Sequence, residues 1–332
     1  MTIVFLLLGV AVISYVIWIS SIGIGRASEM WGCGWSPGVR GATINAIASS
    51  LPEFFTAIVF LAVLGDSKGF VSGLSTVAGS SVFNALVIPG AMILAVFFKT
   101  KSSLTGHDKK IILRDGIWLV AAQTLIYLFI LSGSFSVWHG IVLIIVYALY
   151  IFTLFKYNVV SEDIDCYYAP KTRRSLNIQF LAGIIGVGIG CYALVYLCVE
   201  LGDEFNFNVP VIALLIAAAA TSVPDTILSV RDALKENTDD AISNAFGSNI
   251  FDLCIALGLP LFIYCFFRGD IVLEPSMVDS LSLLWLVLMG MTVVSLVLIY
   301  FSKQLKVSQS VVFISIYLGF VFLVVSGIFD LS

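Results

Sequence analysis

The sequence predicts an all-α polytopic membrane protein with ten transmembrane helices, arranged as two inverted five-helix repeats. Composition is the first observation, because 60% of the 332 residues are hydrophobic and only 11% are charged, which is typical of a chain embedded in lipid. The second is the series of apolar runs, and the third is a short Pro-acid motif that occurs twice. The formal net charge of −4 argues against nucleic-acid binding.

Ten apolar runs are long enough to cross a bilayer. The first is interpreted as a membrane span and not as a signal peptide, because it lacks a basic n-region and a small-residue cleavage site. The predicted spans are 3–24, 39–64, 70–97, 111–131, 137–157, 175–199, 208–232, 241–266, 280–302 and 308–329.

Lysine and arginine fix the expected orientation of these spans. Fifteen of the 17 basic residues fall in the loops after spans 1, 3, 5, 7 and 9 or at the span ends that border these loops, and only Lys68 and Arg268 fall on the other side. Basic loops stay in the cytoplasm, so both termini are expected outside it. The chain is expected in a membrane of prokaryotic inner (plasma) type.

The two motif copies then predict an inverted repeat. One lies in the second span and the other in the seventh, so the two halves cross the membrane in opposite directions. The first repeat is expected over 1–157 and the second over 175–332, joined by a short cytoplasmic linker over 158–174. The motif regions themselves cover 41–90 and 213–260.

The motifs place acids in the middle of apolar segments. Ser49-Ser50-Leu51-Pro52-Glu53 matches Thr221-Ser222-Val223-Pro224-Asp225, and Gly79-Ser80-Ser81-Val82-Phe83-Asn84 matches Gly247-Ser248-Asn249-Ile250-Phe251-Asp252. Ionised carboxylates are costly inside a membrane and usually face a cavity where they serve an ion or a proton. The alternative is that these acids belong to buried structural ion pairs, but the interiors of the spans contain no basic residue that could pair with them.

The spacing gathers oxygen donors on single helix faces. Ala46, Ser49, Ser50 and Glu53 follow the i, i+3, i+4, i+7 pattern, as do Ala218, Thr221, Ser222 and Asp225. Ser80 and Asn84 are one turn apart, and so are Ser248 and Asp252. Three carboxylates, one amide and several hydroxyls suit a hard cation such as Ca²⁺, whereas Zn²⁺ or Cu⁺ would favour His or Cys.

The prolines add backbone oxygens to this predicted site. Pro52 and Pro224 each lack an N–H and disrupt the preceding helical turn. Carbonyls near Ala46–Ser49 and Ala218–Thr221 are then expected to lack full helical partners, and a dehydrated cation can satisfy them at membrane depth.

At these residues the chain resembles the cation/Ca²⁺ exchanger superfamily, especially its Na⁺/Ca²⁺ exchangers. The two motif pairs are similar to that family's alpha-repeats, although Ala48 stands where many members have Gly and Asp225 replaces the more usual Glu. The segment from Gly247 to Pro260 also resembles the K⁺-dependent branch. The G-N-x-x-E pattern of the proton-coupled branch is absent.

The resemblance implies roles for individual residues and a compact prokaryotic-type member. Glu53 and Asp225 correspond to the two central acids that bind Ca²⁺ and share Na⁺, while Asn84 and Asp252 correspond to the other two polar positions. It also implies alternating access by sliding of the first and sixth spans. The implied hydroxyl ligands are Ser50, Ser80, Ser222 and Ser248, and the implied carbonyl ligands are Ala46, Ser49, Ala218 and Thr221.

The leading functional prediction is therefore an electrogenic Na⁺/Ca²⁺ antiporter that is not an enzyme. Ca²⁺, Na⁺ and the lipid bilayer are its expected partners, with no cofactor, no nucleic acid and no obligatory protein partner. K⁺-dependent Na⁺/Ca²⁺ exchange and H⁺/Ca²⁺ exchange on the same fold remain open. A remote alternative is an intramembrane hydrolase that uses Glu53 and Asp225 as an acid pair, but no nucleophile–base set accompanies them.

Overall fold

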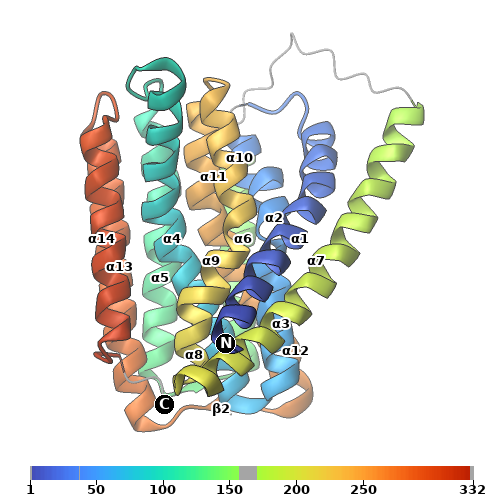
Figure 1. Ribbon diagram of the computed structural model, residues 1–332, viewed down its shortest axis with the longest axis vertical. Helices are drawn as coiled ribbons and strands as arrows, with labels where there is room; N and C mark the ends of the chain where they lie inside the picture. Colours follow the sequence, from blue (N-terminus) through green and yellow to red (C-terminus); the bar gives the residue numbers. More distant parts are fainter. Residues whose placement is uncertain (1, 37, 157–169, 330–332) are drawn as a thin grey trace.

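The computed structural model describes residues 2–36, 38–156 and 170–329, and it is a helical bundle (Figure 1). Nine helices in this part of the chain are long and apolar enough to cross a membrane, and a bent pair supplies a tenth span. The predicted membrane fold of ten spans is thus confirmed. Many large apolar side chains cover the outside of the bundle, as expected where lipid is the solvent.

The first half contains spans one to five. They are α1 (Thr2–Trp31); η1 (Gly41–Asn45), α2 (Ala46–Ser49) and α3 (Leu51–Leu64), which together form the bent span; α4 (Asp66–Thr100); α5 (Lys109–Leu131); and α6 (Val137–Lys156). The segments labelled η are π-helical turns.

The second half contains spans six to ten. They are α7 (Pro170–Phe205); α8 (Val209–Ile212), η2 (Ala213–Ala217), α9 (Ala218–Thr221) and α10 (Val223–Leu234); α11 (Thr238–Phe251), η3 (Asp252–Ala256) and α12 (Gly258–Arg268); α13 (Pro275–Phe301); and α14 (Val307–Val325). The predicted linker over 158–174 lies outside the described residues up to 169. Residues 170–174 belong to α7, so this helix begins earlier than predicted.

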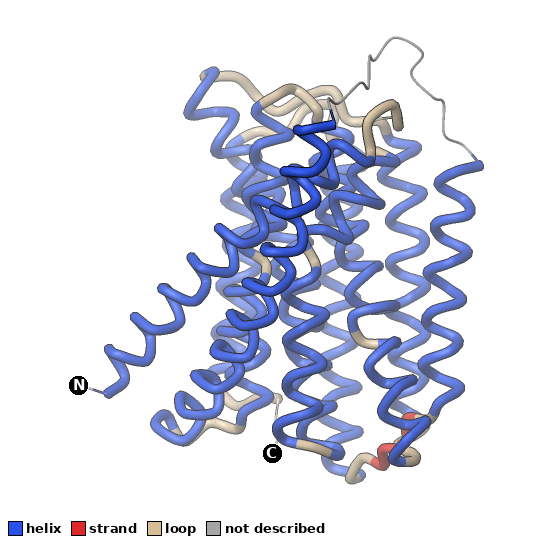
Figure 2. The backbone as a smooth tube through the Cα atoms, turned by 90° about the vertical axis from the view of Figure 1, so that its right-hand side faces the viewer, coloured by secondary structure: helices blue, strands red, loops and turns tan. Residues whose placement is uncertain are grey.

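The two ends of the bundle differ in charge and in structure. One, here called the basic end, carries the loops that follow α1, α4, α10 and α13, and these loops together with the helix ends beside them hold most of the lysines and arginines. The other, the β end, carries strands β1 (Ser134–Phe135) and β2 (Ile271–Val272), which pair antiparallel with Ser134 opposite Val272 (Figure 2). This small sheet joins the two halves and was not predicted from sequence.

Helices α1 and α7 pack together and run obliquely across the more upright helices (Figure 1). A row of glycines on α7 permits their close contact: a Cβ at Gly190 would lie 2.7 Å from Ile17 Cγ1, and one at Gly186 would lie 3.0 Å from Ser20 Cβ. Small residues at membrane helix contacts let the backbones approach closely. The two helices therefore lie in close contact along this row.

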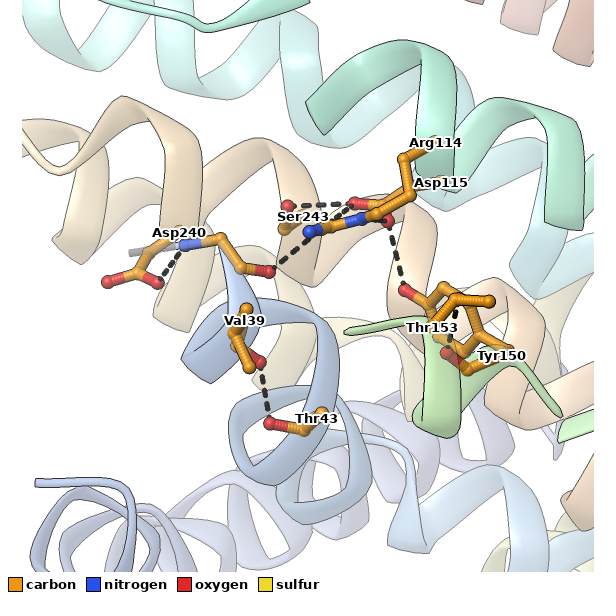
Figure 3. Close-up of polar contacts among 9 residues, drawn as sticks. Val39, Thr43, Arg114, Asp115, Tyr150, Thr153, Asp240 and Ser243 are labelled. Carbon is orange, nitrogen blue, oxygen red and sulfur yellow. Dashed lines mark hydrogen bonds and ion pairs between the residues drawn. The ribbon is translucent and has the colours of Figure 1, made fainter. Parts of the chain in front are cut away.

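A charged anchor fixes the start of the bent span at the basic end (Figure 3). The fully buried carboxylate of Asp240 on α11 accepts the backbone N–H groups of Gly38 at 2.8 Å and Gly41 at 3.1 Å, and it pairs with Arg40. Arg114 on α5 donates to the Gly38 carbonyl at 3.1 Å.

Arg114 is held in turn by the buried carboxylate of Asp115, at 2.7 Å from its Nε. Ser243 and Tyr150 also donate to Asp115, at 2.8 and 3.2 Å. The anchor thus links α5, α6 and α11 to the entry of η1.

Candidate cation site

Three carboxylates converge in the middle of the bundle. Glu53 lies on α3, Asp225 on α10 and Asp252 at the start of η3, and each contributes an oxygen so that these three atoms lie within 4.8 Å of one another. All three side chains are fully buried. None of the ion pairs found among the described residues involves them, so a bound cation is a candidate to balance their charge when they are ionised.

Broken helices place two of these acids. α2 ends at Ser49 and α3 begins at Leu51, with Ser50 between them at φ −91° and ψ 4°. Ser222 separates α9 from α10 in nearly the same conformation, at φ −78° and ψ 0°. Glu53 and Asp225 each fall in the first turn of the new helix, where the helix dipole favours negative charge.

Hydroxyl and amide groups connect the acids. The Ser80 and Ser222 hydroxyls lie 2.9 Å apart, and both donate to Glu53 Oε1, at 3.4 and 3.3 Å. Ser80 also lies 3.3 Å from Asp252 Oδ2. Asn84 donates to Asp225 Oδ2 at 3.1 Å. The two motif pairs, far apart in sequence, thus form one cluster.

Several buried oxygens in this cluster have no hydrogen-bond partner. An unpartnered buried polar atom costs about 1–3 kcal/mol, so a group of them at one place indicates a missing ligand. All of these unpartnered atoms are oxygens, and coordination by oxygen alone suits a hard cation. The unpartnered oxygens are Ser50 Oγ, Glu53 Oε2, Asn84 Oδ1, Asp225 Oδ1 and Asp252 Oδ1.

The predicted backbone ligands lie beside the helix breaks. Ala46 O accepts Ser50 N at 3.0 Å and Ser49 Oγ at 3.3 Å, while Ala218 O accepts Ser222 N at 3.0 Å and Thr221 Oγ1 at 3.2 Å. These two carbonyls therefore retain helical partners, contrary to the simple expectation from the prolines. Their role as ligands stays a prediction.

The remaining predicted hydroxyl ligand, Ser248, receives a hydrogen bond from Asn84 at 3.2 Å and donates to the Ala245 carbonyl at 3.2 Å. The Ser49 hydroxyl bonds Asn45 O at 2.8 Å and lies 3.4 Å from Asn244 Oδ1, and it also neighbours the Asp225 carboxylate. Asn244 also donates to the Asp225 carbonyl at 3.4 Å. Sequence reasoning missed Asn244, although it lies one turn before Ser248 on the same helix face.

The motif glycines bring the helices close enough to build the cluster. A Cβ on Gly247 of α11 would lie 2.7 Å from Ala42 Cα of η1, and one on Gly79 of α4 would meet the Leu214 carbonyl of η2 and lie 2.7 Å from Ala218 Cβ. These glycines therefore permit close helix contact. The glycine-bearing helix of each half, α4 or α11, thus packs on the broken span of the other half.

A cavity of about 270 Å³ lies between α1, α2 and α10 on the basic-end side of the site, and the three carboxylates do not line it. Ser49 and Pro224 form its inner wall, and Arg26 and Arg231 line it farther out. Near the middle of the bundle, Cys191 of α7 contacts the Pro52 carbonyl at 3.3 Å, so α7 packs directly against α3 beside Glu53.

Comparison with known families agrees with this site. The family model described as sodium/calcium exchanger protein matches residues 3–156 and 176–326. The chain belongs to the sodium/calcium exchanger family. The resemblance inferred from the two motif pairs is thereby confirmed.

Curated relatives match over part of their length. The chain is 36% identical over 100 residues to sodium/potassium/calcium exchanger 1 of Gallus gallus, covering 30% of this chain and 15% of that protein. It is 32% identical over 162 residues to sodium/potassium/calcium exchanger 2 of Homo sapiens, covering 48% and 24%. The matched segments thus represent a quarter or less of these relatives.

Solved structures share the fold over nearly the whole chain. An H⁺/Ca²⁺ exchanger, CAX, superposes with a TM-score of 0.68 at 17% identity, covering 97% of this chain and 88% of its own. The sodium–calcium exchanger NCX_Mj superposes with a TM-score of 0.65 at 21% identity, covering 98% and 99%. At these identities the similarity establishes the fold.

Proposed function

We propose that this protein is a secondary antiporter that exchanges Na⁺ for Ca²⁺ by alternating access. The observation that carries the proposal is the fully buried cluster of Glu53, Asp225 and Asp252, whose oxygens approach within 4.8 Å and include unpartnered acceptors. Such a cluster at paired helix breaks is the arrangement of a transporter site at a repeat interface. Family membership supports the same conclusion.

Charge balance makes the exchange electrogenic in this proposal. With all three acids ionised, three Na⁺ neutralise the site and one Ca²⁺ leaves a charge of −1. The exchange then moves net charge and responds to membrane potential by about 2.3 kcal/mol per charge per 100 mV. Glu53 and Asp225 are proposed as the main Ca²⁺ ligands, with the implied hydroxyl and carbonyl ligands completing the coordination.

K⁺-dependent Na⁺/Ca²⁺ exchange is the second candidate. It is favoured by the match to proteins named sodium/potassium/calcium exchangers, together with the position of Asp252 as a third carboxylate beside the main pair. A solved neighbour is an H⁺/Ca²⁺ exchanger, so proton coupling belongs in the same test.

The packing of α1 and α7 against each other, obliquely across the other helices, supports their proposed role as the sliding gate helices. The basic end is proposed to face the cytoplasm, which places both termini outside and is consistent with the bias of lysine and arginine. A plasma membrane of prokaryotic type is the proposed location.

Flux into proteoliposomes tests the function. ⁴⁵Ca²⁺ uptake is measured with an outward gradient of Na⁺, of Na⁺ plus K⁺, or of H⁺. Uptake driven by Na⁺ alone is expected, and stimulation by K⁺ selects the second candidate. Uptake that only the H⁺ gradient drives contradicts the Na⁺ coupling.

Cysteine labelling tests the orientation. Cysteines replacing Ser134, at the β end, and Thr172, at the start of α7, are expected to react with an impermeant thiol reagent from opposite sides, Ser134→Cys from outside and Thr172→Cys from the cytoplasm. Labelling of both from one side contradicts the inverted topology.

A further inference from the structure

A row of buried polar side chains leads from the carboxylates toward the basic end, and the proposed ion ligands do not include it. On α10, Asp225, Ser229 and Asp232 follow the i, i+4, i+7 pattern of one helix face. Asn45 precedes Ser49 by one turn on the neighbouring span. Asn45 and Asp232 are only 2% and 5% exposed, and Ser229 is fully buried.

Hydrogen bonds connect this row to the cation site. Asn244 donates to Ser229 Oγ at 2.9 Å and to the Asp225 carbonyl at 3.4 Å. Farther out, Asn45 Nδ2 lies 3.5 Å from Asp232 Oδ2, which is long for a hydrogen bond. Asp232 is about 10 Å along the helix from Asp225, at 1.5 Å per residue.

Asn45 supplies the observation that points to a ligand. Its Oδ1 is buried and has no hydrogen-bond partner, although the same amide faces Asp232. A half-turn of the amide exchanges its oxygen and nitrogen in nearly the same space. The oxygen would then face the Asp232 carboxylate, an arrangement that a cation between the two oxygens stabilises.

Asp232 can release its present partner when a cation arrives. Arg231 Nη2 lies 3.6 Å from Asp232 Oδ1, and the Arg231 side chain is 37% exposed. A long, partly exposed ion pair contributes little to stability. The Arg231 side chain also lines the cavity at the basic end, so water reaches this ion pair.

The repeat provides an internal comparison, because the equivalent positions on the β-end side of the carboxylates carry no such row of polar side chains. The offset that aligns Glu53 with Asp225 also aligns Phe60 with Asp232, Ala57 with Ser229 and Ala217 with Asn45. Phe60 is fully buried in an apolar cluster. The row is thus a property of one side and not of the fold in general.

We propose that Asn45 and Asp232 form a second cation site, which holds the transported Ca²⁺ or Na⁺ between the basic end and the central carboxylates. The carboxylate and amide oxygens are ligands that hard cations accept. This second site rests on the proposed transport function and deepens it. Because only cations that enter from the basic end meet the Asp232 carboxylate, the two faces of the transporter should differ in their apparent affinity for the cation.

The test measures the apparent KM for Ca²⁺ separately at each face, in vesicles of known orientation. Asp232→Asn is expected to raise the KM at the basic-end face roughly five- to tenfold, because a charge in a partly desolvated site is removed. The KM at the β-end face should stay unchanged. Glu236→Gln, an exposed charge at the same end, is the matched control and should change neither value.

A second variant carries the test if Asp232→Asn fails to fold. Asn45→Asp adds a charge to the site and should lower the KM at the basic-end face by a similar factor. Unchanged KM values, or equal changes at both faces, overturn the second site.

Failure of the proposed function is a separate result. Ca²⁺ flux that H⁺ drives instead of Na⁺ overturns the Na⁺ coupling and leaves this measurement intact, because the KM for Ca²⁺ at each face is compared whichever ion drives exchange. Wild-type protein without Ca²⁺ flux under any gradient overturns both proposals.

Discussion

The two Pro-acid segments are close matches in sequence, yet the helices that carry them bend differently. The first bends by 46° between Gly41–Ser49 and Leu51–Leu64, whereas Val209–Leu234 forms a single span. The backbone at the two breaks is nearly the same, at Ser50 and Ser222. The motif therefore determines the break, and other contacts determine the bend.

The difference lies in what holds each segment. The first starts at Gly38 and Gly41, which the Asp240 carboxylate binds at the basic end. The second starts at the β end with Pro210 in the first turn of α8, and a proline there only presets the helical backbone. The first segment is therefore held at its start by a charged side chain, whereas the second begins without one. The two halves of the cation site are positioned in different ways.

The largest effect is expected at the centre, where the two segments should behave alike. Glu53→Gln and Asp225→Asn should each reduce Ca²⁺ exchange by about a hundredfold or more, because each removes an anionic ligand from a site with few. ⁴⁵Ca²⁺ flux is the measurement, with monodisperse elution in detergent as the control for folding. Near-normal uptake by folded Asp225→Asn protein would refute the central site.

The anchor should distinguish the two segments. Asp240→Asn leaves the partly exposed Arg40 without its charge partner and weakens two backbone hydrogen bonds, so the free energy of unfolding should fall by about 2–3 kcal/mol. Ser72 holds the equivalent position in the first half, and its hydroxyl bonds only the Lys68 carbonyl at 2.9 Å. Ser72→Ala should therefore be nearly neutral in thermal denaturation, and equal losses would show that the anchor has no special role.

The motif glycines allow a finer comparison. Gly79→Ala and Gly247→Ala both place a methyl group against backbone of the opposite half, with an expected cost of about 1–3 kcal/mol for overpacking. Gly79 should be the more sensitive, since its Cβ would meet a carbonyl oxygen directly. Gly319→Ala, which has open space around it, is the control. Melting temperatures that do not differ among the three variants would contradict the close approach.

The smallest expected change concerns the coupling of Ca²⁺ flux to Na⁺ or K⁺. Asp252 is paired by the repeat with Asn84, so one of two equivalent positions already works as a neutral amide. Asp252→Asn should weaken the Na⁺ or K⁺ dependence of ⁴⁵Ca²⁺ flux about three- to tenfold, because it removes a charge while keeping a carbonyl oxygen. Unchanged dependence on both ions together with lost Ca²⁺ binding would make Asp252 a primary Ca²⁺ ligand.

Sequence patterns predicted the parts of this molecule that depend on local spacing. Ten apolar runs predicted the spans, and the duplicated acids predicted which side chains meet. The anchor of Asp240 and Arg114 was missed because it joins groups separated by more than 70 residues, and nothing in the spacing of one sequence reveals such pairs. The 46° bend was missed because the matching prolines predict the same break in both spans, whereas only the first span bends this far.

Asn244 could have been found, because its position one turn before Ser248 repeats the spacing used for the ligands. The early start of α7 at Pro170 follows a different rule: proline is well tolerated in the first turn of a helix. A hydropathy window ignores this and begins the helix only where the apolar residues begin.

The reciprocal packing of the glycines has a consequence for the origin of the molecule. Gly79 of the first half contacts the broken span of the second, and Gly247 of the second contacts the broken span of the first. One half alone holds neither contact and only part of the carboxylate cluster. Two separate five-helix chains, inserted in opposite orientations, would form the same pair of contacts as an isologous dimer. The single chain is thus equivalent to an antiparallel homodimer whose subunits have been fused, and co-expressed halves should reassemble the centre.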